Sequence, residues 1–444
     1  MTRPLPLLAC LLVCCLVSGL AAAKPKDGKA APAEPVDYRS DHFYLHTDLP
    51  PSDAQELLER LETMLELIST YWARPCLGII ECYVVADLAH WPTGMIPEEG
   101  LAHIKAGAGV TSVTTLSSGG QSLSRSVVYS VADRGTPQHE AVHAYCGQTF
   151  GTTGPVWYSE GMAEMGQYWR KDDTSVQIHE GVLDYLRSST PKSIDEIVHA
   201  EEFTGDSWQN YAWRWALCHL LAYNTNYASR FRPLGLAFLK KEPTSFEEAY
   251  GDMTREIEFE YHFFLSHLDQ GFRNDLCSWD WQRKFRAPKG SAALTSKIKA
   301  DHGWQPSGAI VAAGADYQCK ATGSWQTAKD AQPRSADGVE RELRNRDHQT
   351  GGETDNDPDE ANEGEKGDAI DDADGRLMGV VLSDDDENYR LSEPFELGGD
   401  ATFTAPADGK LYLRCRDSWG KLADNKGTLT VKIKAKRNAS RARE

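Results

Sequence analysis

The sequence has few basic residues for its length. It carries 47 Lys and Arg against 66 Asp and Glu, which gives a formal net charge of -19 at pH 7. Because nucleic-acid phosphates are bound by clustered Lys and Arg, this balance argues against a nucleic-acid partner, and we interpret the acidic surplus as solubility. Beyond Leu20 no stretch is apolar enough to span a bilayer. The remaining composition, 40% hydrophobic and 9% aromatic over 444 residues, predicts a globular protein of about two or three domains.

Cysteines are also few, and their spacing shows no zinc-ribbon pattern. Three of the ten lie before residue 16. The other seven form an odd set, which leaves at least one thiol unpaired or paired between molecules. These seven are Cys76, Cys82, Cys146, Cys218, Cys277, Cys319 and Cys415.

The amino-terminal segment has the pattern of a cleaved signal peptide. Arg3 precedes an apolar run from Leu5 to Leu20, and small residues follow up to Ala23. Lipoprotein processing at Cys10 is disfavoured because too little apolar sequence precedes it. We therefore expect a signal peptide over residues 1–23 and a secreted or periplasmic protein. Residues 24–40, rich in Lys, Pro and Ala, are predicted to form a flexible leader.

Residues 41–288 are predicted to form an α+β domain. "SDHFYLHTD" and "GIIECYVVAD" are typical of strands, and a helix with apolar residues at helical spacing should begin behind a capping box from Ser52 to Gln55. Most segments between 130 and 270 favour helix. Residues 297–436 consist of short β-type runs and predict an all-β sandwich, interrupted by a mobile acidic loop at 353–375.

The segment "GTPQHEAVHAYCG", residues 135–147, contains two histidines four residues apart. With Thr136 as the cap and Pro137 in the first turn, His139 and His143 would lie on one face of a helix, where both imidazoles can bind one zinc ion. Glu140 would then face the open coordination position, where it could accept a proton from water. The alternative is an ordinary helix that contains two histidines.

The following segment, "GPVWYSEGMAEMGQYW", strengthens the zinc interpretation. It predicts a second helix that carries Glu160 and Glu164 on one face, among large apolar side chains. Glu160 lies seventeen residues after His143, enough for a turn and an antiparallel helix to bring its carboxylate to the metal as third ligand. Glu164, one turn further, could hydrogen-bond the outer nitrogen of a ligating histidine.

"HEAVH" followed by "WYSEGMAE" resembles the gluzincin zinc peptidases, in particular their peptidase-MA-like branch. The resemblance spans about residues 41–285. It implies zinc ligation by His139, His143 and Glu160, with Glu140 as general base. It also implies that Tyr211, at the start of "YAWRWALCHLLAY", assists the reaction; the alternative is a core aromatic. No "GAMEN"-like segment precedes the zinc helix, which argues against aminopeptidase action.

Residues 297–436 resemble the galactophilic PA-I-type lectin fold. The similarity lies in "GWQPSGAIVAAGADYQCKATGSW", "GRLMGVV" and "GKLYLRCRDSWGKLADNKGTLTVKI". It implies a Ca²⁺ site at Asp417, Asp424 and Asn425 that would bind carbohydrate, because hard oxygen ligands suit calcium. Lys426 stands where the lectin has a small residue, and its charge would oppose calcium. The alternative is a sandwich that binds neither calcium nor sugar.

Together these patterns predict an exported zinc metallopeptidase with a lectin-like β-sandwich, acting on a peptide or protein substrate. Two alternatives stay open. One is a carbohydrate-binding adhesin whose metalloprotease-like half is inactive, and the other is a zinc hydrolase of a non-peptide substrate.

Overall fold

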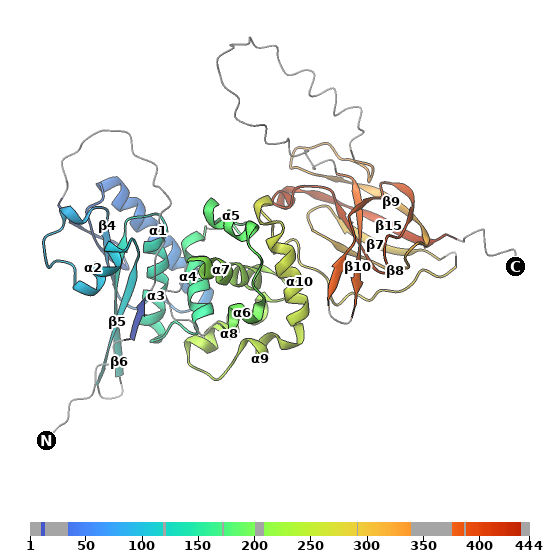
Figure 1. Cartoon of the computed structure of the whole chain (residues 1–444). Helices are drawn as coiled ribbons and strands as arrows, with labels where there is room; N and C mark the ends of the chain where they lie inside the picture. The colour runs from blue at the N-terminus through green and yellow to red at the C-terminus, as the bar shows by residue number, and fades with distance from the viewer. Residues whose placement is uncertain are drawn as a thin grey trace, which may run out of the picture. The chain divides into compact units, whose positions relative to one another are not determined.

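The computed structural model describes residues 10–13, 34–118, 121–170, 173–199, 208–290, 292–338, 375–385 and 388–436 (Figure 1). The chain forms two compact units, Met1–Leu268 and Asp269–Glu444. The sequence predicted that the first domain ends at residue 288. In the structure the first unit ends at Leu268, and residues 269–288 belong to the second unit. The predicted acidic loop at 353–375 lies outside the described residues except for Gly375.

The first unit combines one sheet with many helices, as the sequence predicted. Its strands are β1 (Cys10–Val13), β2 (Val36–Arg39), β3 (Phe43–Thr47), β4 (Ile80–Val85), β5 (Val110–Ser118) and β6 (Gln121–Val131). Its α-helices are α1 (Pro51–Trp72), α2 (Glu98–Lys105), α3 (Thr136–Phe150), α4 (Val156–Tyr168), α5 (Glu180–Ser188), α6 (Ile194–Val198), α7 (Trp208–Tyr223), α8 (Ala228–Leu239), α9 (Phe246–Tyr250) and α10 (Thr254–Leu265). Short 3₁₀ turns are η1 (Leu88–His90) and η2 (Gly251–Met253), while η3 (Leu268–Gln270) spans the boundary between the two units.

The six strands form one mixed sheet in the order β1-β5-β6-β4-β3-β2. The central strands β3, β4 and β6 are parallel, and the remaining pairs are antiparallel. Strand β1 lies within the predicted signal segment and pairs with β5; the rest of that segment falls outside the described residues. Strand β2 lies within the predicted flexible leader, where pairing with β3 gives residues 36–39 a regular structure.

Helices cover both faces of this sheet. Alternate residues of a strand face opposite sides, and on β6 the Ser126 hydroxyl donates to the backbone of Ala144 in α3. Tyr129, on the other face, packs beside Gly100 of α2. Helix α1 packs against α3 and β3. Helix α3 therefore lies between the sheet and other helices.

The capping box predicted from Ser52 to Gln55 is wrong. Helix α1 begins at Pro51, its N-cap is Pro50, and no side chain caps it. The Ser52 hydroxyl donates to Asp53 instead, because Ser52 already lies inside the first turn. The apolar repeat behind the prediction does form the buried face, which includes Leu57, Leu61, Leu65 and Ile68.

The second unit is a sandwich of two antiparallel sheets, as predicted. Its strands are β7 (Leu294–Lys299), β8 (Gln305–Val311), β9 (Asp316–Gln326), β10 (Leu377–Asp384), β11 (Tyr389–Leu391), β12 (Phe395–Glu396), β13 (Asp400–Thr404), β14 (Gly409–Cys415) and β15 (Lys426–Ala435), with a 3₁₀ turn η4 (Leu422–Asp424). One sheet has the order β11-β10-β14-β8 with β12 on β10, and the other has the order β13-β9-β15-β7. Inward side chains of both sheets, such as Val381 and Val431, form one core.

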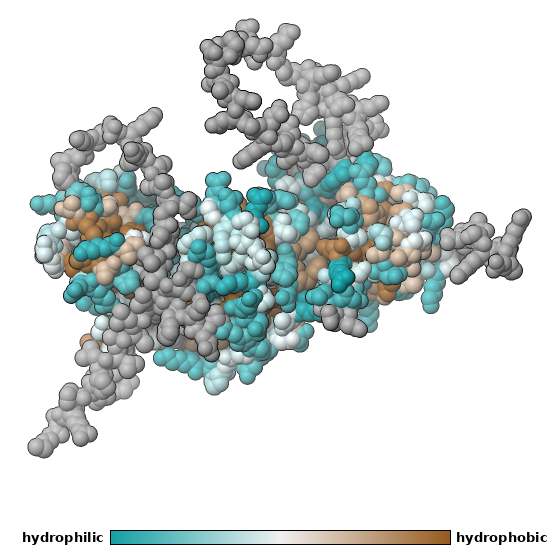
Figure 2. Space-filling view, in the orientation of Figure 1, coloured by the Kyte–Doolittle hydropathy of each residue, from teal (hydrophilic) through white to brown (hydrophobic). Residues whose placement is uncertain are grey.

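The seven cysteines from Cys76 to Cys415 are all buried and free of disulfides. No described helix is long and apolar enough to cross a membrane. In Figure 2 the visible surface over the helical part of the first unit is mostly hydrophilic. Large exposed hydrophobic side chains in the described part of the chain stand apart in sequence: Val36, Leu77, Met95, Leu116 and Ile310.

Candidate metal centre

Helix α3 begins at Thr136, with Pro137 in its first turn as predicted. The capping role predicted for Thr136 is wrong. The Asp133 carboxylate accepts hydrogen bonds from the backbone amides of Gly135 and Thr136 and from the Thr136 hydroxyl. An Asp three residues earlier thus supplies the acceptor that the open amides of a helix start require.

The histidine motif lies inside the protein rather than on a solvent-facing helix. His139 is 5% exposed, and Glu140 and His143 are each 1% exposed. Such burial is unfavourable for polar side chains unless each finds a partner. The partners therefore decide whether the motif can hold a metal.

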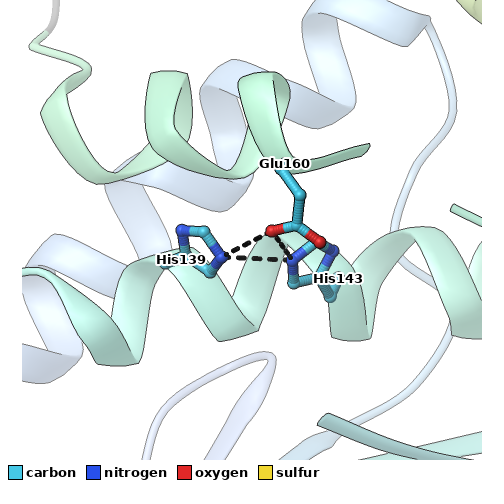
Figure 3. Close-up of side chains that lie close together, drawn as sticks. All are labelled: His139, His143 and Glu160. Carbon is cyan, nitrogen blue, oxygen red and sulfur yellow. Dashed lines mark hydrogen bonds and ion pairs between the residues drawn. The ribbon is translucent and has the colours of Figure 1, made fainter. Parts of the chain in front are cut away.

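Helix α4 supplies the third group. It packs closely on α7, because a Cβ at Gly161 would lie 2.7 Å from the backbone oxygen of Arg214. The glycine of "SEGMAE" is thus required for the close approach of the two helices. The neighbouring residue Glu160 is fully buried, and its carboxylate faces α3 (Figure 3).

The ligand atoms of His139, His143 and Glu160 converge on one point. The two Nε2 atoms are 3.2 Å apart, and Glu160 Oε2 lies 3.3 Å from His139 Nε2 and 3.4 Å from His143 Nε2 (Figure 3). Ligands about 2.0–2.1 Å from a tetrahedral metal lie about 3.3–3.4 Å from one another. Within the described residues, these three form the group of His, Cys, Asp and Glu side chains that could hold a metal ion.

Glu160 carries the negative charge of this group. Burial by itself would raise the pKa of Glu160, but the charge of His143 and hydrogen bonds from both histidines outweigh it and hold that pKa well below its usual range. Two imidazole nitrogens and a carboxylate oxygen at these distances repel one another through their lone pairs unless a proton or a metal lies between them. A divalent cation would satisfy all three at once.

Both histidines are oriented through their outer nitrogens. Glu164 Oε1 lies 3.0 Å from His139 Nδ1, so the contact predicted for Glu164 is present. The Ser159 hydroxyl lies 3.3 Å from His143 Nδ1. A proton on Nδ1, shared with Glu164 in His139 and with Ser159 in His143, would be the tautomer in which Nε2 of each ring can act as a metal ligand.

Only one of the two carboxylate oxygens of Glu140 has a hydrogen-bond partner. Thr111 Oγ1 lies 2.8 Å from Glu140 Oε2, whereas Oε1 is buried without a hydrogen-bond partner. Burial raises the pKa of Glu140, and the charges of His139 and His143 offset only part of this shift. A bound divalent cation would oppose the shift further through its own charge.

Tyr211 lies in the first turn of α7 beside the metal centre. Its side chain is 5% exposed, and its ring centroid is 5.8 Å from that of His139. The Arg214 guanidinium lies 5.6 Å from the centre of the Tyr211 ring. The structure therefore brings Tyr211 next to the ligands, across 72 residues of sequence from His139.

The three residues predicted to bind calcium in the sandwich lie in two different environments. Asp417 and Asn425 are buried together, and Asn425 Nδ2 donates to Asp417 Oδ2 over 2.7 Å. The other Asp417 oxygen accepts from the Ser418 amide. Asp424 is exposed and accepts from the backbone amide of Lys329.

A buried arginine side chain lies at the same loop. Arg414 donates through its guanidinium to the backbone oxygen of Asp417, and it stacks 3.5 Å from the centre of the Trp419 ring. Burial raises the pKa of Asp417, and the hydrogen bond from Asn425 offsets part of that shift. The protein's own donors thus satisfy the Asp417 carboxylate.

Comparison with known proteins gives little beyond these observations. The chain matches no protein-family model and no curated protein sequence. A solved structure described as the EclA N-terminal domain, a PllA-like lectin, is similar over 32% of this chain and 96% of its own, with 18% identity and a TM-score of 0.21.

Sequence reasoning missed two contacts of this centre. One is the contact of Ser159 with His143. Ser159 directly precedes Glu160 on the same helix, and a hydroxyl next to a predicted ligand could have indicated this contact. Thr111 lies on the β5–β6 hairpin, and the alternation around Gly119 and Gly120 in the sequence could have indicated that hairpin.

Proposed function

We propose that this protein is an exported zinc-dependent hydrolase of peptide bonds. The observation that carries the proposal is the convergence of His139 Nε2, His143 Nε2 and Glu160 Oε2 on one point, beside a buried Glu140 oxygen that has no partner. Export rests on the signal-like sequence at residues 1–23. The peptidase assignment rests on the resemblance of "HEAVH" and "WYSEGMAE" to gluzincins.

Two imidazoles and one carboxylate at tetrahedral spacing suit zinc and leave one coordination position open. Zinc held there would act as a Lewis acid that polarises a carbonyl group and lowers the pKa of water. Glu164 and Ser159 would hold the two histidine rings in the orientation that this ligation needs.

Glu140 and Tyr211 are the residues proposed to act on the substrate. Glu140 Oε1 would accept a proton from the attacking water, because the oxygen is buried and its partner position is open. Tyr211 would donate its hydroxyl proton in a hydrogen bond to the oxygen that becomes negative during attack. Its position in the first turn of α7 gives that donor a rigid support.

The two alternatives make different predictions about the same residues. A zinc hydrolase of another substrate needs the metal and Glu140 but cleaves no peptide. An adhesin with an inactive half needs neither Glu140 nor turnover, and its function would depend on carbohydrate binding by residues 297–436, which stays a prediction.

The test uses full-length protein purified without chelator and incubated with a diverse peptide library. We expect cleavage that stops on chelation and returns with zinc. Glu140→Gln should keep the metal and the fold yet abolish turnover, because an amide cannot accept the proton. Glu59→Gln, an exposed change on α1, serves as the control. Absence of cleavage by metal-loaded wild type would reject the peptidase assignment.

A further inference from the structure

We propose that Thr111 positions Glu140 for its reaction and that Gly109 keeps open the space beside its free oxygen. This inference rests on the proposed function, in which Glu140 accepts a proton. It concerns Gly109, which directly precedes β5, and Thr111, the second residue of that strand; neither the sequence patterns nor the resemblance assigns them a role.

Thr111 is held in place by the sheet, independently of its contact with Glu140. It is 1% exposed and pairs with Val128 of β6 inside the sheet. Its hydroxyl lies 2.8 Å from Glu140 Oε2 and 2.8 Å from the Glu140 backbone oxygen. A hydroxyl has one proton, so it serves one of these acceptors at a time, yet both belong to residue 140. Strand β5 is therefore tied to this residue in either case.

This contact distinguishes the two carboxylate oxygens. Oε2 is engaged by Thr111, while Oε1 is buried with no partner. A glutamate side chain has several torsions, and a rigid support at one oxygen restricts them. Thr111 thus determines which oxygen is presented to the reacting water.

Gly109 supplies the space that this arrangement needs. A Cβ at residue 109 would lie 2.7 Å from Glu140 Cγ, 2.7 Å from Thr136 Cγ2 and 3.0 Å from Glu140 Oε1. Gly109 is not among the glycines with positive φ, so its backbone would accept an alanine. An alanine there would therefore press on the Glu140 side chain and on Thr136 at the start of α3.

The first experiment compares Thr111→Val with Thr111→Ser and with Thr115→Val in full-length protein. Valine keeps the shape without the hydroxyl, serine restores the hydroxyl, and Thr115 is an exposed threonine on the same strand that contacts Ser124. We expect Thr111→Val to lower kcat about tenfold or more with little change in KM or zinc content, the scale of one hydrogen bond to a charged group. Serine should recover most of the rate, and Thr115→Val should match wild type.

A second arm needs no turnover. Acetohydroxamic acid binds a zinc ion and gives up a proton that a neighbouring carboxylate can take, so its affinity reports the placement of Glu140. We expect weaker binding, by about fivefold or more, in Thr111→Val and in Gly109→Ala, with Thr111→Ser close to wild type. If Thr111→Val fails to fold, as judged by thermal melting, Gly109→Ala carries the same comparison.

The two arms separate the two proposals. If wild-type protein cleaves no peptide, the peptidase assignment is rejected. The hydroxamate series would still report on Thr111 in that case. Unchanged kcat and unchanged hydroxamate affinity in folded, zinc-loaded Thr111→Val and Gly109→Ala would overturn the positioning role. A loss that serine does not restore would also overturn it, because the hydroxyl would then not be the cause.

Discussion

The candidate metal centre on α3 and α4 and the Asp417–Asn425 loop of the sandwich both contain ligand types that the sequence associated with metals. In the first, two nitrogens and one oxygen face a common point at 3.2–3.4 Å from one another. In the second, both oxygens of Asp417 accept hydrogen bonds from the chain, and Asp424 is exposed.

The difference lies in whether the protein itself supplies the partners. Buried polar groups require hydrogen bonds or a cation. Around Asp417 the protein provides Asn425, the Ser418 amide and the nearby Arg414. Around Glu160 it provides the Nε2 atoms of two imidazoles at 3.3 and 3.4 Å, an arrangement that a shared proton or a metal ion would stabilise. Ligand atoms that converge on one point are a better indicator of a metal site than ligand types at a given spacing.

The strongest test of the comparison removes the third ligand. Glu160→Ala should lose stoichiometric zinc and all peptide cleavage, because two histidines bind the metal too weakly and the site opens to water. Metal analysis of the purified protein measures this, with Glu66→Ala on the exposed face of α1 as control. Full zinc content in folded Glu160→Ala would show that the ligand set is different.

Removal of the Tyr211 hydroxyl should have the next largest effect. Tyr211→Phe is expected to lower kcat by about a hundredfold to a thousandfold, the usual scale for one oxyanion donor, while zinc content and melting temperature change little. Steady-state kinetics on a peptide found in the library screen would measure it. Tyr44→Phe, on β3, provides the control, and normal turnover by Tyr211→Phe would return Tyr211 to the role of a core aromatic.

Glu164 should influence the metal through His139 alone. Glu164→Gln is expected to weaken zinc affinity by about tenfold to a hundredfold, because the 3.0 Å contact to Nδ1 loses its charge. Competition with a zinc chelator gives the affinity. An affinity equal to that of wild type would show that the contact does not orient the ring for binding.

The smallest effect is expected in the sandwich. Wild type and Asp417→Ser should give the same heat when calcium is titrated at millimolar concentration, with or without galactose, because the oxygens of Asp417 are already hydrogen-bonded. Using the difference between two full-length proteins removes any contribution from other acidic residues. A calcium signal that disappears in Asp417→Ser would show that the loop rearranges to bind the ion.

The metal centre was accessible to sequence reasoning because it depends on helical periodicity. His139 and His143 share a face at a spacing of four, and the Gly-Pro break before α4 indicated the return of the chain with Glu160 and Glu164. By contrast, the contact of Thr111 with Glu140 joins a strand to a helix 29 residues later. No local pattern determines which strand of a sheet meets a given helix residue.

The errors have local causes. Thr136 and Ser52 are residue types that favour an N-cap, yet Asp133 and Pro50 precede them and shift the helix start. In the Asp417–Asn425 loop, where calcium binding stays a prediction, spacing alone does not determine the direction of a side chain. Asp424 points to solvent and the backbone of Lys329, while Asn425 turns inward.

The seven buried thiols have a consequence for how an exported chain would survive oxidation. Disulfide exchange needs a thiolate, and burial raises the pKa of Cys76 to about 11 and of Cys277 and Cys319 to about 12. Burial and a raised pKa both slow the reaction of these thiols with oxidants in the folded state, although the seven cysteines from Cys76 to Cys415 form no disulfide. Its vulnerable period is the interval before folding, when each thiol has the reactivity of a free cysteine. Correct maturation then depends on whether the chain folds faster than its surroundings can oxidise it.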